Sequence, residues 1–152
     1  MTPLQGAFGG TELIAWRLET SKHFPTWQTA EGAFLVGGRW SSAGRRVLYT
    51  SIDPATAIVE VGVHEVGVHK GFNTLDAVPH TRPGTISAEQ QSFGDGLLAS
   101  NPLVVVPSVV STHSWNLLID VAGAAGLFSL RGSEAFALDS RLNPTAAAIP
   151  RP

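Results

Sequence analysis

The chain has 152 residues, 43% of them hydrophobic, which suits one folded domain with a core of its own. Its net charge of −2 and its lack of a basic run argue against a nucleic-acid-binding protein, and its lack of cysteine excludes disulfides, thiolate catalysis and cysteine-ligated zinc. No apolar run reaches the ~18 residues of a membrane span, and residues 1–10 lack a signal-peptide pattern, so we expect a cytoplasmic protein without a membrane anchor.

The first fifty residues are predicted to contain two strands separated by loops. Residues 12–19 are rich in bulky apolar side chains and predict an opening strand that includes Arg17. Residues 20–33 contain proline, glycine and polar side chains, which predict a loop. A glycine at position 44 predicts a turn over residues 44–46, and the run that follows predicts a second strand over residues 47–51.

A helix is predicted to begin directly after this second strand. The pair Asp53-Pro54 supplies an N-cap acceptor and a proline at the first helical position, which predicts a helix over residues 54–69. Valines alternate with other residues over positions 58–64, and this strand-like period gives a competing interpretation. In both geometries a step of four residues returns to the same side, so Glu60 and His64 are expected to share a face.

The rest of the chain is predicted to consist mainly of short strands, over residues 74–79, 103–106, 109–110, 115–121 and 136–142. Residues 80–101 predict a loop with a short helix near positions 87–93. Pro107 separates the segments 103–106 and 109–110 and predicts an edge, a bulge or a break there. Glycines at 123 and 126 lack the spacing of a dinucleotide-binding motif and predict a turn.

This order of elements favours the α+β class. Strands outnumber helices and do not alternate regularly with them, which argues against a doubly wound parallel sheet. We expect one domain over residues 1–144, followed by a loose tail over residues 145–152 that is rich in alanine and proline.

Arg39 is the first candidate functional residue, because it lies within the sequence GGRW in a chain of which only 14% is charged. A guanidinium in such surroundings usually binds a carboxylate or a phosphate through its planar fork. Glycines beside it allow a ligand to approach the backbone closely. The alternative is a surface arginine whose aliphatic stem covers Trp40.

Three further candidates precede residue 70. Tyr49 is the only tyrosine of the chain, and it either packs within a strand or stacks on a flat heterocycle. Glu60 lies among apolar residues and is either solvated or buried and paired, with His64 as a partner one helical turn later. His64 and Glu65 are followed by His69 in an HExxxH spacing, one residue too long for the zinc motif HExxH, so we expect no metal.

Two polar residues stand out in the second half of the chain. Ser108 follows the strand-breaking proline and lacks the GxSxG surroundings of a hydrolase nucleophile, which favours a turn serine that bonds to the backbone. Asn116 lies in an apolar strand and must find hydrogen-bond partners, either within the protein or in a ligand.

Seven segments in order resemble the RES-domain family, whose members are the toxins of many bacterial toxin–antitoxin pairs. They are Arg17, GGRW at 37–40, LYTS at 48–51, DPATAIVEVGVH at 53–64, VPS at 106–108, Asn116 within WNLLID, and FALDSRL at 136–142. The resemblance covers roughly residues 12–142. This chain departs from the family at Ser41, where asparagine is frequent, and at Asp120-Val121, where Asn-Pro is frequent.

The resemblance implies an ADP-ribosyltransferase-like fold, with two small β-sheets around a cleft for NAD⁺. It implies an enzyme that breaks the bond between nicotinamide and ribose and passes ADP-ribose to water or phosphate, so that NAD⁺ is degraded. Transfer of ADP-ribose to a host protein is the first alternative, and a non-catalytic domain that only binds a nucleotide or a partner is the second. The implied partner is an antitoxin with a helix-turn-helix domain, whose C-terminal part blocks the active site.

The same resemblance assigns roles to individual residues. Arg39, Glu60 and Ser108 correspond to the arginine, glutamate and serine for which the family is named, and are the expected catalytic residues. The residues expected to bind NAD⁺, as the substrate, are Arg39, Tyr49, Ser51, His64, Arg17 and Asn116.

Overall fold

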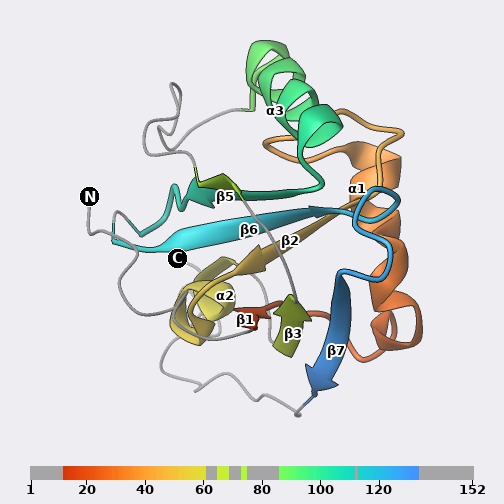
Figure 1. Cartoon of the computed structure of the whole chain (residues 1–152), viewed down its shortest axis with the longest axis vertical. Helices are drawn as coiled ribbons and strands as arrows, with labels where there is room; N and C mark the ends of the chain where they lie inside the picture. The colour runs from red at the N-terminus through yellow and green to blue at the C-terminus, as the bar shows by residue number, and fades with distance from the viewer. Residues whose placement is uncertain (1–11, 61–64, 69–72, 75–85, 112, 134–152) are drawn as a thin grey trace, which may run out of the picture.

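The computed structural model describes residues 12–60, 65–68, 73–74, 86–111 and 113–133 of the chain. Within these residues the fold is α+β, as predicted, with seven strands in one sheet of order β4-β5-β6-β2-β1-β3-β7 (Figure 1). The strands are β1 (Leu13–Trp16), β2 (Val47–Ser51), β3 (Glu65–Val68), β4 (Asn73–Thr74), β5 (Leu103–Pro107), β6 (Trp115–Asp120) and β7 (Phe128–Gly132). The helices are the 3-10 helix η1 (Phe24–Thr29), α1 (Glu31–Val36), α2 (Pro54–Glu60) and α3 (Ala88–Ser100).

The sheet consists of two blocks that meet at one point. Strand β2 pairs with β6 along its whole length, and β1 pairs with β3 along its whole length. Between β1 and β2, however, the register is the single pair Trp16↔Ser51. In Figure 1, β3 and β7 accordingly run steeply across the direction of β5 and β6. The two small sheets expected from the sequence are therefore joined into one, and the join lies between β1 and β2.

The central strands are buried on both faces, which explains why β5 and the apolar part of β6 read as continuous apolar runs. Alternate residues of each strand point to opposite faces. One face packs Leu48, Val105 and Ile119 against Trp27 of η1. The other face packs Val47, Val104 and Leu118 against Trp40 and against Leu98 of α3. The candidate residue Arg39 thus belongs to a segment that covers the α3 side of the sheet.

The predicted helix start at Asp53-Pro54 is confirmed, but the predicted helix end is wrong. Asp53 Oδ1 accepts a hydrogen bond from the Thr56 backbone N–H at 2.9 Å, which is the N-cap interaction. The helix ends at Glu60, and residues 65–68 form strand β3. Val66 and Val68 alternate with Glu65 and Gly67, which favours strand over helix there. Of the competing strand predicted over residues 58–64, residues 58–60 are helical and residues 61–64 lie outside the described residues.

Other elements were misassigned or shifted. The predicted loop at 20–33 contains η1 and the start of α1, and the predicted short helix near 87–93 is the longer helix α3. Strand β7 was not predicted. Strand β1 ends at Trp16, so that Arg17 lies just beyond it. The predicted break at Pro107 is confirmed, because β5 ends at that residue. The predictions for residues 75–79, for the strand at 136–142 and for the tail lie outside the described residues. No described helix is both long enough and apolar enough to cross a membrane.

The N-cap of α2 predicts a pH-dependent stability. Burial alone would raise the pKa of Asp53, but hydrogen bonds from Ser114 and Thr56 together outweigh it and hold that pKa below its usual value. We expect Asp53→Ala to lower the free energy of unfolding by ~1 kcal/mol at pH 7. Because the folded-state pKa is depressed, this contribution is complete above the unfolded-state pKa of ~3.9 and is lost as the pH falls through the folded-state value.

Thermal unfolding of the wild type and of Asp53→Ala at several pH values checks this expectation. The difference between their melting temperatures should be constant near neutral pH and should narrow below about pH 4. A gap of the same size at pH 7 and at pH 3 would show that the carboxylate charge is not what stabilises the helix start.

Candidate functional site

A cavity of about 320 Å³ lies where β1 and β2 separate. Beyond the pair Trp16↔Ser51 the two strands do not continue their ladder, and the residues that would have continued it line the cavity instead. The lining residues are Trp16, Arg17, Leu18, Glu19, Tyr49, Thr50, Ser51 and Ala57. The cavity therefore brings together Arg17, Tyr49 and Ser51, three of the residues predicted to bind a ligand.

Arg17 supplies the positive charge of this cavity and Glu19 supplies a negative one. The Glu19 carboxylate accepts hydrogen bonds from Arg17 Nη2 at 2.8 Å and from Nε at 3.1 Å. Arg17 Nη1 also donates to the backbone oxygen of Tyr49 at 3.1 Å, which ties the end of β1 to β2. Glu19 was missed in the sequence, although residues two apart in an extended segment lie on one side and the pattern Arg-x-Glu could have indicated the pair.

Ser51, which lines the cavity, is joined to the polar side chain of Asn116 on the neighbouring strand. They lie opposite each other on β2 and β6, and Ser51 Oγ donates to Asn116 Oδ1 at 2.7 Å. Both are buried. Asn116, a polar residue in the apolar strand β6, thus has a hydrogen-bond partner within the protein.

Arg39 lies at the tip of a tight hairpin, in which Gly38 and Ser41 form an isolated β-bridge. Gly37, at the start of this hairpin, has φ of +74°, a conformation that glycine adopts without strain. Arg39 is half-buried, and its Nη1 lies 3.5 Å from Oε1 of the buried Gln90 on α3. The guanidinium is therefore directed toward the N-terminal part of α3.

Tyr49 connects the cavity with this hairpin. Its hydroxyl accepts a hydrogen bond from the Trp40 backbone N–H at 3.0 Å and shares another with Ser41 Oγ at 2.9 Å. Burial raises the pKa of the Tyr49 hydroxyl, and the hydrogen bonds offset part of that rise. The Tyr49 hydroxyl is accordingly neutral at physiological pH. The Tyr49 ring also lies close to the hairpin backbone, because a Cβ at position 38 would lie 2.4 Å from the Tyr49 hydroxyl oxygen. Position 38 therefore requires glycine.

The remaining predicted site residues have different positions. Ser108 is buried, and its Oγ accepts hydrogen bonds from the backbone N–H groups of Val110 and Ser111 at 3.3 and 3.2 Å, as in a serine turn. Glu60 is the last residue of α2, the helix whose Ala57 lines the cavity. His64 lies outside the described residues, so its predicted place beside Glu60 is not tested. Among the residues that the structure describes, no group of three potential metal ligands occurs.

The chain is similar in sequence to known proteins over most of its length. Residues 14–82 match the family model described as "RES domain". A protein named "Toxin Res" from Pseudomonas putida is 27% identical over 148 residues, which cover 86% of this chain and 99% of that protein. Another "Toxin Res", from Photorhabdus laumondii, is 38% identical over 52 residues, which cover 34% of this chain and 33% of that protein. The chain is thus similar to the RES domain over residues 14–82 and to proteins named "Toxin Res".

Proposed function

We propose that this protein is the toxin of a toxin–antitoxin pair and that it cleaves the bond between nicotinamide and ribose in NAD⁺. In this proposal ADP-ribose passes to water or phosphate, and the cellular supply of NAD⁺ falls. The observation that carries the proposal is the cavity between β1 and β2, which gathers Arg17, Tyr49 and Ser51 beside the hairpin of Arg39. Its volume of about 320 Å³ is at the lower end of the ~300–1,000 Å³ of ligand pockets, which suits the nicotinamide riboside half of the molecule.

The residues have distinct roles in this proposal. Cleavage of the glycosidic bond builds positive charge on the ribose ring, and we assign the stabilisation of that charge to the Glu60 carboxylate. Arg39 binds the diphosphate, because its planar fork suits phosphate oxygens. Ser51 contacts the ligand from the cavity wall, and Asn116 holds Ser51 in place through their hydrogen bond. Tyr49 forms part of the cavity wall and supports the hairpin. This role explains the hydrogen bonds of its hydroxyl to the hairpin better than stacking on the nicotinamide ring does.

The cavity also has a charge balance that suits NAD⁺. Glu19 neutralises Arg17 within the cavity, so the pair offers no net positive charge to repel the cationic pyridinium ring. Arg39 lies on the separate hairpin, where a cation suits the anionic diphosphate. The antitoxin of the pair is proposed to carry a helix-turn-helix domain and to block this cavity with its C-terminal part.

Arg39→Ala is expected to weaken NAD⁺ binding by about 10- to 100-fold, the loss that removal of a charged hydrogen-bond donor causes. Calorimetric titration with carba-NAD⁺, in which the glycosidic bond resists cleavage, measures the dissociation constant. Arg131→Ala is the matched control, since Arg131 is an exposed arginine of β7 that pairs with Glu12. An unchanged dissociation constant in Arg39→Ala would assign Arg39 to the surface and remove it from the site.

The acceptor of ADP-ribose is tested with NAD⁺ labelled in its adenine ring. Incubation with the purified protein should give free nicotinamide together with labelled ADP-ribose or its phosphorylated form. The same label in a cell lysate should stay in small molecules. A labelled protein band would instead show that the protein transfers ADP-ribose to a host protein and would refute NAD⁺ degradation as the main reaction.

A further inference from the structure

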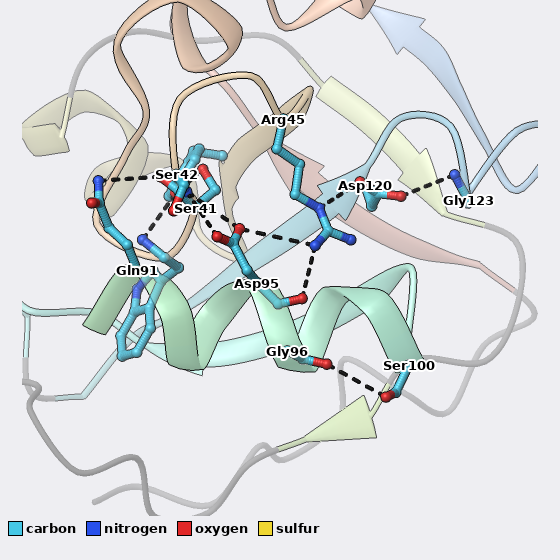
Figure 2. Close-up of polar contacts among 11 residues, drawn as sticks. Ser41, Ser42, Arg45, Gln91, Asp95, Gly96, Ser100, Asp120 and Gly123 are labelled. Carbon is cyan, nitrogen blue, oxygen red and sulfur yellow. Dashed lines mark hydrogen bonds and ion pairs between the residues drawn. The ribbon is translucent and has the colours of Figure 1, made fainter. Parts of the chain in front are cut away.

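The hairpin that carries Arg39 is held from α3 by the side chain of one residue. Gln91 Nε2 donates to the backbone oxygen of Gly38 at 2.9 Å and to that of Ser41 at 3.3 Å. These two carbonyl groups flank Arg39 and Trp40, so a single amide group joins both ends of the hairpin tip. Figure 2 shows Gln91 beside Ser41 and Ser42, above the start of α3.

The helix residue that follows by one turn holds the same hairpin at its exit. The Asp95 carboxylate accepts from the Ser42 backbone N–H at 3.2 and 3.3 Å. Arg45 in turn donates to the Asp95 backbone oxygen at 2.7 Å and to Asp120 Oδ1 at 3.1 Å (Figure 2). This network fixes the position of α3 relative to β6, and hence fixes the point from which Gln91 reaches the hairpin.

Contacts on the opposite side of the hairpin complete its support. The Tyr49 hydroxyl binds the Trp40 N–H and Ser41 Oγ from β2. The backbone around Arg39 is thus hydrogen-bonded from the sheet on one side and from α3 on the other. Arg39 Nη1 also reaches Gln90 Oε1 of α3 at 3.5 Å, so the direction of the guanidinium depends on how the hairpin backbone is held against α3.

We propose that Gln91 is a positioning residue for Arg39, an inference that rests on the proposed role of Arg39 in binding the diphosphate of NAD⁺. By bridging the carbonyl groups of Gly38 and Ser41, Gln91 keeps the hairpin tip in the conformation that presents the guanidinium. A binding group that is held before the ligand arrives loses less conformational entropy on binding. Gln91 therefore strengthens NAD⁺ binding without contacting NAD⁺.

Two substitutions test this role. Gln91→Met keeps the length of the side chain and removes both hydrogen bonds, and Gln91→Glu keeps the shape but sets a carboxylate against two carbonyl oxygens. Each should raise the dissociation constant of carba-NAD⁺ by about 5- to 20-fold, as expected for the loss of one or two hydrogen bonds. Ser92→Ala, at the next and exposed position of α3, is the matched control and should leave the dissociation constant unchanged.

A double-mutant cycle separates positioning from a general effect on the fold. In the Arg39→Ala background, Gln91→Met should cause no further loss of carba-NAD⁺ affinity, because the group that it positions is absent. Losses of carba-NAD⁺ affinity that add up in the double variant would overturn the inference. An unchanged affinity in Gln91→Met or Gln91→Glu would also overturn it, provided that Arg39→Ala binds carba-NAD⁺ more weakly than the wild type. If Arg39→Ala binds as the wild type does, the proposed role of Arg39 fails first. Melting temperatures of all variants identify those that are folded, and Gln91→Glu replaces Gln91→Met in the cycle if the latter does not fold.

Discussion

Glu60→Gln is expected to lower the rate of NAD⁺ cleavage by about 100- to 1,000-fold, the usual cost of removing a group that stabilises developing charge in the transition state. The substitution keeps the size of the side chain but removes the negative charge opposite the ribose cation. The fold should survive, because Glu60 is the last residue of α2 and the cap of that helix lies at its other end. Chromatographic measurement of nicotinamide release gives the rate, and circular dichroism checks the fold.

Glu31→Gln provides the comparison for this experiment. Glu31 is an exposed glutamate that pairs with Arg46 rather than with a residue of the cavity, so its substitution should leave the cleavage rate near that of the wild type. A folded Glu60→Gln variant with near-wild-type turnover would remove Glu60 from the mechanism. The dissociation constant for carba-NAD⁺ should stay within a few-fold in both variants.

Gly94→Ala is expected to lower the free energy of unfolding by about 1–3 kcal/mol, which is typical of overpacking at a tight contact. A Cβ at position 94 would lie 2.1 Å from the backbone oxygen of Trp40, so α3 and the hairpin must move apart. For a chain of this size the melting temperature should fall by about 2–4 °C for each kcal/mol. The same displacement should weaken carba-NAD⁺ binding, since it moves the hairpin that carries Arg39.

Gly96→Ala on the same helix is the matched control. A Cβ at Gly96 would meet no atom within 4 Å, and alanine favours the helix over glycine by ~0.5–1 kcal/mol. The two substitutions should therefore shift the melting temperature in opposite directions. A fall of similar size in both would show that the contact between Gly94 and Trp40 is not what holds α3 against the hairpin.

The elements that could be predicted from the sequence are those whose signals are local. Strand β2 agrees with its predicted bounds, because its short apolar run lies between a glycine turn and the Asp-Pro helix start. The start of α2 is encoded by the capping residue and proline alone. Strand β7 has a half-exposed pattern, and η1 and α1 lie in a segment with proline and glycine, so their local signals were weak or misleading.

Some residues of the cavity could be predicted from the sequence, but their contacts could not. Arg17, Tyr49 and Ser51 were identified from the sequence, and the structure brings them to one cavity. The partners Glu19 and Gln91 were missed. Gln91 lies about fifty residues beyond the hairpin that it bonds, and no pattern within a single element indicates such a long-range contact. The single residue pair between β1 and β2, which opens the cavity, is likewise a property of the assembled sheet.

The most direct test of the proposed site is a crystal structure of the protein with carba-NAD⁺. The account predicts the nicotinamide riboside half in the cavity between β1 and β2, and the diphosphate within hydrogen-bond distance of Arg39. It also predicts the Glu60 carboxylate beside the ribose. A dinucleotide bound elsewhere, or bound here with Arg39 and Glu60 both directed away from it, would contradict the account.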